Sequence, residues 1–533
     1  MMEPTALDRR WIIAAVWLWL ACCSAYFLTA PGRIDIVDGA ARYDVTTSLL
    51  ELGKPEIFND YAPAIEGRGG RRYAFYPIGT SLIALPFVMA GGWLGSGSVE
   101  SKQFAFSMVS VPFAAAAVAV FFLILGRLGC GIRAAVGWAL ALAFCTPMWV
   151  YAGSSFDQAL QAFFLLVAVW MAIEALASDS VRWALVSGAA FAWLVNVQET
   201  YAVLAACLFD VSPPTMRAAL DRFNNRVVRI IVALVGAGVA VVLAYNVYKF
   251  GNPLDTGRTA VKHPLIGNPI VGFAGLFISP AKSVFLYCPI YLFALLGVRR
   301  LLQRDRERFR PVFACLAVHI AMTASLKFWA GEWAWGPRYL VASMPLACLG
   351  LPFAVGSKLG RRLLWASCAL SFAVQVMAIS VDHQRYYVER RLVPYFWVVE
   401  SYMYKDSPLL ERPFEMAEVL TGRDLPKVRA LVPGPRPFSM TSVAYGPSLE
   451  DWKRTPEWMR EFLLFDAPRP WPLWIRWVRP DLRPGRADLM IGAGLTIGAL
   501  SSLALLLSVL GEGRVRATHS LLASFKNEQV IET

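Results

Sequence analysis

The sequence predicts an all-α polytopic membrane protein with about 12 transmembrane helices. Hydrophobic residues make up 57% of the chain and charged residues only 17%, and the mean hydropathy is +0.49. A soluble domain carries about 25% charged residues. Apolar runs close to the ~20 residues that cross a bilayer recur along the chain, and arginines collect in short loops between them, as in cytoplasmic loops.

The first apolar run is Trp11–Ala30, preceded by the pair Arg9 and Arg10. The two arginines predict a cytoplasmic N-terminus. We expect a retained anchor rather than a cleaved signal, because the apolar stretch is long and further spans follow. The polar stretch that comes next belongs to a first external loop, 31–101, in which Arg42–Leu52 has the pattern of a short amphipathic helix.

The run Tyr76–Leu94 is apolar but interrupted by Pro77, Pro86 and adjacent glycines. We expect a juxtamembrane or re-entrant helix here, with a true span as the alternative. The strongest cytoplasmic marker is the basic loop Arg299–Arg310. The further predicted membrane segments are Lys102–Leu125, Ala134–Tyr151, Asp157–Ala177, Trp183–Val197, a return beginning at Tyr201–Phe209, Ile230–Tyr248, Phe285–Val298, Val312–Leu326, Tyr339–Val355, Leu363–Val381 and Leu489–Leu510.

Three regions follow from this pattern. Residues 1–381 form the transmembrane module, 382–487 an external segment rich in proline and tryptophan, and 488–533 the last transmembrane helix and a cytoplasmic tail. In the external segment we expect short helices and loops packed over an external cavity, because its prolines disfavour a regular sheet. Trp452–Trp458 is predicted to open a short helix, and Trp471–Trp477 to lie on the membrane surface.

The net charge is +13, from 51 basic and 38 acidic residues. Cytoplasmic loops account for this excess, and the sequence contains no compact basic and aromatic module typical of a nucleic-acid-binding protein. No nucleic-acid partner is therefore predicted. The nine cysteines show no spacing typical of a zinc site or a disulfide framework.

Two carboxylates follow the first span. A catalytic base must be held near the hydroxyl that it deprotonates, and a carboxylate can serve. Asp38 is the first candidate and Asp35 the second. The structural alternative for Asp38 is a helix N-cap, since it precedes Gly39 and a helical run and caps favour Asp.

Two further acidic motifs fall on the same predicted face. Asp157 lies at the start of a span, where its structural alternative is a helix cap, and Glu199 lies among amides in an expected external hairpin. A carboxylate at membrane depth is costly and usually faces a polar cavity. Both are therefore candidate site residues.

Cations on this face go against the positive-inside trend. Lys282 and Arg258 are predicted to be external, where a lipid phosphate is a natural partner and snorkelling to headgroups is the alternative. The stretch Lys327–Tyr339 adds Arg338, which suits bidentate phosphate binding. The predicted donor-phosphate-binding residues are thus Lys282, Arg258 and Arg338.

The stretch Lys327–Tyr339 also holds three tryptophans around Glu332. Aromatic faces flanked by charged groups suit a sugar ring, and an interfacial aromatic belt is the structural alternative. The predicted sugar- and acceptor-binding residues are Tyr43, Asp157, Glu199, Glu332, Trp333 and Trp335.

Taken in order, these motifs resemble the GT-C superfamily of integral membrane glycosyltransferases, in particular the protein mannosyltransferase and aminoarabinose transferase relatives. The matching blocks span roughly residues 1–350. They are Asp38–Tyr43 with Ser48–Gly53, Tyr76–Leu82, Phe250–Gly257, Ser279–Tyr287 and Trp333–Tyr339.

The resemblance implies transfer of a sugar from a polyprenyl-phosphate donor to an acceptor hydroxyl on the external, periplasmic face, with inversion and with Asp38 as base. It also implies a multi-pass protein of the bacterial inner membrane, in contact with membrane lipids, whose acceptor is a lipid, a glycan or a protein. Relatives often have Asp-Glu where this chain has Asp38 and Gly39, which leaves Asp35 as a competitor. Some relatives use a divalent metal; no ligand set is evident here, so no metal is firmly predicted.

Other classes of protein fit parts of the pattern. A lipid or glycan transporter or flippase should show internal repeats and broken helices near the midplane. A non-catalytic membrane protein of polysaccharide assembly would keep its function after Asp38→Asn. Hydrolysis in place of transfer is a further alternative.

Overall fold

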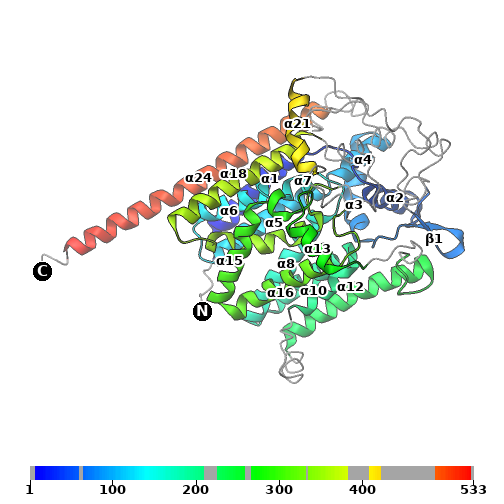
Figure 1. Cartoon of the computed structure of the whole chain (residues 1–533), viewed down its shortest axis with the longest axis horizontal. Coiled ribbons are helices and arrows are strands. Elements are labelled where there is room, and N and C mark those ends of the chain that lie inside the picture. The colour runs from blue at the N-terminus through cyan, green and yellow to red at the C-terminus, as the bar shows by residue number, and fades with distance from the viewer. Residues whose placement is uncertain are drawn as a thin grey trace.

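The computed structural model describes residues 7–58, 64–208, 225–257, 266–331, 334–381, 407–421 and 486–529. These residues are mostly helical and form a bundle (Figure 1). Six helices among them are long and apolar enough to cross a membrane, as expected of a multi-pass protein; the count of about 12 stays a prediction. The six are α1 (Arg9–Thr29), Val99–Arg127, α8 (Gln158–Ser178), α12 (Arg226–Phe250), α18 (Lys358–Ser380) and Asp488–Leu510 of α24 (Arg486–Gln529).

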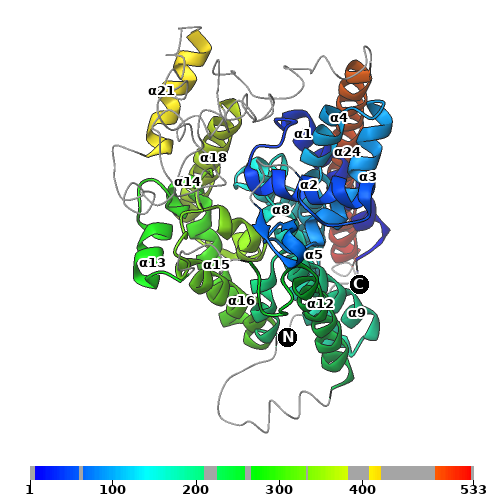
Figure 2. The same ribbon diagram turned by 90° about the vertical axis from the view of Figure 1, so that its right-hand side faces the viewer.

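The predicted first external loop, 31–101, forms a small layer of its own, with its helices beside one another in both views (Figure 1, Figure 2). It contains α2 (Val37–Leu52), α3 (Gly79–Leu94) and α4 (Val99–Ser107), which is followed by α5 (Ser110–Arg127). At 1.5 Å per residue, the 16 residues of α3 extend about 24 Å, which is shorter than the ~30 Å hydrocarbon core. This length favours the predicted juxtamembrane helix over a true span.

The start of α2 corrects two expectations. The helix begins at Val37 rather than Arg42, and its N-cap is Ile36. Asp38 therefore lies in the first turn, and the interpretation of Asp38 as an N-cap is wrong. A two-stranded antiparallel ribbon, β1 (Ile65–Glu66) with β2 (Arg72–Tyr73) around the short 3₁₀ turn η1 (Arg68–Gly70), also adds a small sheet to the predicted all-α fold.

Several predicted spans are interrupted at prolines, which cannot donate a helical hydrogen bond. The span Ala134–Tyr151 is replaced by α6 (Ile132–Phe144) and α7 (Met148–Ala152), with Pro147 at the break. The span Phe285–Val298 becomes α14 (Val284–Tyr287) and α15 (Ile290–Arg304), with Pro289 between them.

The predicted span Tyr339–Val355 is also wrong as one continuous helix. It is replaced by the short pieces η4 (Arg338–Ser343), α17 (Met344–Cys348) and η5 (Leu351–Phe353). A close approach to α15 accompanies the break, since a Cβ on Gly297 would lie 1.9 Å from the carbonyl oxygen of Gly350.

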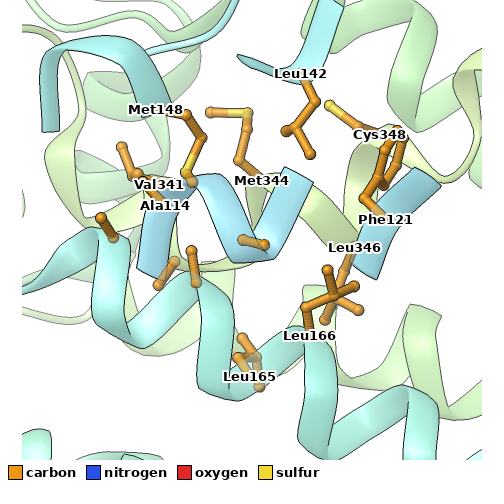
Figure 3. Packing of buried hydrophobic residues seen from close by; sticks show 14 of the residues in the cluster. Ala114, Phe121, Leu142, Met148, Leu165, Leu166, Val341, Met344, Leu346 and Cys348 are labelled. Carbon is orange, nitrogen blue, oxygen red and sulfur yellow. The ribbon is translucent and has the colours of Figure 1, made fainter. Parts of the chain in front are cut away.

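The remaining helices lie near their predicted positions. They are α9 (Val181–Val197), η2 (Glu199–Tyr201), α10 (Ala202–Ala206) and α16 (Arg306–Ala324); α13 (Pro269–Phe277) was not predicted. The 3₁₀ and α-helical pieces from Arg338 onward lie in the centre of the bundle, where their side chains pack against α5, α6, α7 and α8 (Figure 3). In a membrane such packing, rather than exclusion of water, holds helices together.

The first described helix, α1, and the last, α24, run side by side (Figure 1, Figure 2). Ser24 Oγ donates to the carbonyl of Gly494 at 2.8 Å. Within the segment 382–487, α21 (Pro408–Thr421) is a short helix, and Ser407 just before it donates to the carbonyl of Pro280 at 2.8 Å. The predicted features at Trp452–Trp458 and Trp471–Trp477 lie outside the described residues.

Candidate functional site

Three segments that are far apart in sequence meet at the end of the bundle where α2 begins. The loop before α2 is tied to the turn before α8 by Asp35, whose Oδ2 accepts from Ser154 Oγ at 2.6 Å and whose Oδ1 accepts from the backbone N–H of Ser155 at 2.7 Å. Asp35 is only 4% exposed. Both of its carboxylate oxygens thus bind the 154–155 turn.

Gly39 lies against the 154–155 turn, and the structure gives a steric reason for glycine at this position. A Cβ at this position would lie 2.5 Å from Cβ of Ser155 and 3.3 Å from its carbonyl oxygen. Any larger residue would push the 154–155 turn away from α2. The close approach that Asp35 secures therefore depends on glycine here.

Asp38 is held differently from Asp35. Tyr76, just before α3, donates its hydroxyl to Oδ1 of Asp38 at 2.5 Å, and Nη1 of Arg338 lies 3.7 Å from Oδ2. The Asp38 side chain is 15% exposed. The carboxylate is thus oriented by a phenol, paired with a guanidinium, and still partly accessible.

Arg338 reaches this position from the start of η4. Its guanidinium carbon lies 4.1 Å from the centroid of the Phe156 ring and 4.8 Å from that of Tyr339, and Nη2 donates to the Tyr339 hydroxyl at 3.1 Å. Such stacking suits the planar, weakly hydrated guanidinium. The cation is therefore positioned between aromatic faces and next to Asp38.

The segment that leads to Arg338 is fixed by buried polar contacts. Nζ of Lys282 donates to the carbonyl of Ala334 at 2.7 Å and to that of Gly336 at 3.5 Å, and Tyr151 donates to the carbonyl of Trp335 at 2.8 Å. The Trp335 ring is buried against Tyr287, with centroids 4.9 Å apart. Lys282 and Trp335 thus both hold the turn before Arg338; their predicted phosphate and sugar contacts stay predictions.

Asp157 forms a buried ion pair with Arg42, with Oδ2 2.8 Å from Nη2 and both side chains at most 4% exposed. Asp157 occupies the N-cap position of α8, but its side chain makes no cap hydrogen bond. Burial raises the pKa of Asp157, and the Arg42 guanidinium opposes that rise. Arg42 also lies over the Tyr76 ring at 4.3 Å, so the pair supports the phenol that orients Asp38.

A line of buried polar side chains continues from Asp157 into the bundle. Gln161 Nε2 donates to Asp157 Oδ1 at 2.9 Å, and Tyr201 donates its hydroxyl to Gln161 Oε1 at 2.9 Å. Tyr201 also lies 3.0 Å from Nε2 of His319, whose Nδ1 is 2.9 Å from Ser343 Oγ. A hydrogen-bonded network of this kind holds its side chains in one conformation, including that of Asp157 at its end.

Neither Arg42 nor Tyr76 was predicted as a site residue, although Arg42 lies in the block Asp38–Tyr43 and Tyr76 in the block Tyr76–Leu82. The available signal was helical spacing, since Arg42 follows Asp38 by four residues on α2. Tyr43 instead faces α4: its hydroxyl donates to the carbonyl of Val99 at 3.4 Å, and its ring packs edge-on against Phe106. Burial raises the pKa of Tyr43.

The structure leaves the other predicted residues less defined. Glu199 lies half-buried on η2, two residues before Tyr201. The described part of the chain contains no group of three or more His, Cys, Asp and Glu side chains that could hold a metal ion. The predicted residues outside the described ranges are Arg258, Glu332 and Trp333.

No protein-family profile matches the sequence, and no curated protein matches it. Among solved structures, the chain is similar to ArnT from Cupriavidus metallidurans bound to undecaprenyl phosphate, with a TM-score of 0.43 and 14% sequence identity over 77% of this chain and 72% of that one. It is also similar to ArnT from Cupriavidus metallidurans in the apo state, with a TM-score of 0.43 and 14% identity over 86% and 84% of the two chains. At this level of similarity, the chemistry of the site has to be judged from its own residues.

Proposed function

We propose that the protein is a membrane glycosyltransferase that moves a sugar from a polyprenyl-phosphate donor to a hydroxyl of a lipid, glycan or protein acceptor. The observation that carries this proposal is the pairing of Asp38 with Arg338 at the end of an apolar helical bundle. Transfer from a phosphate donor needs a base for the acceptor hydroxyl and a cation for the departing phosphate. Here the two groups lie 3.7 Å apart.

Asp38 is the proposed base, in preference to Asp35. Both oxygens of Asp35 already accept hydrogen bonds from the 154–155 turn, so protonation of Asp35 would weaken the contact that closes the site. Asp38 is more exposed than Asp35 and is oriented by a single phenol, Tyr76. A base has to exchange a proton with its substrate, and this requires access.

In the proposed reaction, the acceptor oxygen forms a bond to the anomeric carbon while the bond from that carbon to the phosphate oxygen breaks. The hydroxyl proton passes to the Asp38 carboxylate. The polyprenyl phosphate leaves with the bonding electrons, and Arg338 stabilises its charge. Displacement from the opposite face inverts the anomeric centre.

The other residues have supporting roles in this proposal. Lys282 is a positioning residue for Arg338, because it binds the carbonyls of the turn before it. The Arg42–Asp157 pair positions Tyr76 and, through Tyr76, Asp38. Direct contacts with sugar, acceptor or phosphate remain proposals for Tyr43, Glu199, Trp335, Glu332, Trp333 and Arg258, as does the location of the site on the periplasmic face.

The test is transfer by the purified protein in proteoliposomes supplied with a panel of polyprenyl-phosphate sugars. A base typically contributes about 10²–10⁴-fold, so Asp38→Asn should lower turnover by that factor. Asp35→Asn is the matched control, and we expect it to act mainly through lower stability. Full turnover by Asp38→Asn would remove the proposed base. Movement of labelled donor across the vesicle membrane without any transfer would support the flippase alternative.

A further inference from the structure

The line of buried polar side chains that leaves Asp157 ends on the element that carries Arg338. We refer to it as the polar network, and its members are Asp157, Gln161, Tyr201, His319 and Ser343. Ser343 is the last residue of η4, and Arg338 is the first. One short element therefore holds both the end of the polar network and the cation of the candidate site.

The members of the polar network that follow Asp157 come from four different elements. Gln161 lies on α8, Tyr201 on η2, His319 on α16 and Ser343 on η4. Each of these four side chains is at most 5% exposed. A polar group that lost its partner here would be left without water to replace it, so the network favours a single arrangement of these elements.

At the Asp157 end, the amide of Gln161 sets the direction of the hydrogen bonds. Its Nε2 donates to Oδ1 of Asp157 at 2.9 Å, and its Oε1 accepts the hydroxyl of Tyr201 at 2.9 Å. The amide passes no proton along, because its nitrogen only donates and its oxygen only accepts. The polar network therefore holds positions and does not carry protons.

At the other end, the imidazole of His319 links Tyr201 to Ser343. The single proton of the Tyr201 hydroxyl is used towards α8, so Nε2–H of His319 donates to the Tyr201 oxygen at 3.0 Å. Nδ1 of the neutral ring then accepts from Ser343 Oγ at 2.9 Å, a shorter contact than the 3.3 Å from that oxygen to the carbonyl of Leu340. Every donor thus points from η4 towards the Asp157 carboxylate, and hydrogen bonds aligned in this way strengthen one another.

The polar network and the contacts of the candidate site form a closed loop. In one direction, Asp157 leads through Arg42 to Tyr76. Tyr76 orients Asp38, which lies 3.7 Å from Arg338. In the other direction, the polar network leads from Asp157 to the far end of η4. A contact of 3.7 Å is too long for a hydrogen bond, whereas each link of the polar network is 3.0 Å or shorter, so the interior path holds η4 more firmly than the direct contact does.

We propose that Tyr201 and His319 are positioning residues, which fix Arg338 relative to Asp38 by holding η4 against α8. The inference rests on the proposed function, because the separation of a base and a cation matters where both act on one substrate. Tyr201 and His319 act through η4, without contact with the substrate. A displacement of about 1 Å at a reacting group can cost about 10²-fold in rate, so a loosened η4 is expected to slow transfer.

The test is a double-mutant cycle on transfer by the full-length protein in proteoliposomes, with the same panel of polyprenyl-phosphate sugars. Tyr201→Phe should lower kcat roughly tenfold and change the KM for the donor less than about threefold, because the departing phosphate gains its charge in the transition state. In an Arg338→Gln background, Tyr201→Phe should lower kcat by less than about twofold, since the cation that it positions is gone. Equal effects in the two backgrounds would overturn the proposal.

Tyr26→Phe is the matched control. Tyr26 is 1% exposed and donates to the carbonyl of Ala143 at 3.1 Å, so this variant also loses one buried hydrogen bond, but outside the polar network. It should leave kcat unchanged, and a loss as large as that of Tyr201→Phe would contradict the positioning role. Ser343→Ala breaks the link at η4 and should repeat the effect of Tyr201→Phe, which keeps the test decisive even if Tyr201→Phe does not fold.

Hydrogen–deuterium exchange of the amides of η4 needs no turnover, so the two proposals can fail separately. Tyr201→Phe and Ser343→Ala should each speed this exchange at least tenfold, and Tyr26→Phe should not. Faster exchange in a protein that transfers no sugar would support the hold on η4 and refute the glycosyltransferase. Transfer by the wild type, with exchange and kcat unchanged in both network variants, would do the reverse.

Discussion

Asp157→Asn should be far more destabilising than its small size suggests. The substitution keeps the shape of the side chain but removes the charge that faces Arg42, whose side chain is 4% exposed. Breaking a buried ion pair from one side costs about 3–5 kcal/mol, because the remaining charge stays buried without compensation. The expected loss in the free energy of unfolding of the solubilised protein is therefore about 3–5 kcal/mol.

The chain offers a matched control on its surface. Lys102 and Glu51 form an ion pair with an N–O distance of 2.7 Å, almost the same as in the buried pair, but the side chains are 23% and 58% exposed. Solvent-exposed pairs contribute about 0–1 kcal/mol. Glu51→Gln should therefore change the free energy of unfolding by no more than about 1 kcal/mol.

The assay is denaturant or thermal unfolding of the protein in detergent, with fluorescence and size-exclusion readouts. The double variant Arg42→Met with Asp157→Asn should regain part of the stability lost by Asp157→Asn alone, since no charge is then left unpaired. Equal effects of Asp157→Asn and Glu51→Gln, or no recovery in the double variant, would refute the reasoning. The conclusion that burial makes the Arg42–Asp157 pair important would then be wrong.

Two further substitutions test the packing and the orientation of the site. Gly39→Ala should lower the free energy of unfolding by about 1–3 kcal/mol, because the added Cβ overpacks against Ser155. The control is Gly137→Ala in α6, where an added Cβ meets nothing within 4 Å, and this variant should be neutral or stabilising by up to about 1 kcal/mol. Equal melting temperatures for the two variants would contradict this expectation. Tyr76→Phe removes the hydrogen bond to Asp38, worth about 1.5–3 kcal/mol because it involves a charged group, and should lower kcat/KM by roughly 10–100-fold. Unchanged turnover in a panel of donor sugars would exclude a positioning role for the phenol.

Local patterns in the sequence determined much of the helical architecture. The apolar runs that became α8, α12 and α18 were predicted within about five residues of their observed ends, because a span of ~20 apolar residues is recognised without any tertiary contact. The prediction of a juxtamembrane or re-entrant helix at Tyr76–Leu94 came from Pro77, Pro86 and the adjacent glycines; the 16-residue length of α3 favours it, and it remains a prediction. The sidedness of the termini and of the site rests on the arginine pattern alone and remains a prediction.

Prolines and tertiary contacts together decided where helices break. The sequence 339–355 is apolar enough for one span, yet it folds as three short pieces in the centre of the bundle. Pro345 lies at the start of α17 and Pro352 in η5, and Gly350 also approaches the backbone of Gly297, so an uninterrupted helix does not form there. No periodicity within the segment reports on a neighbour that is about fifty residues away.

For the site, the sequence by itself predicted that acids and cations would share one face with the loop 31–101. Only the tertiary structure separated their environments. Asp35 and Asp38 are three residues apart and chemically identical, but Asp35 is taken up by Ser154 and Ser155, more than 100 residues later, while Asp38 meets Tyr76 and Arg338. The physical reason is that accessibility and hydrogen bonding of a carboxylate depend on which distant segments pack against it, and spacing along the chain does not encode that packing.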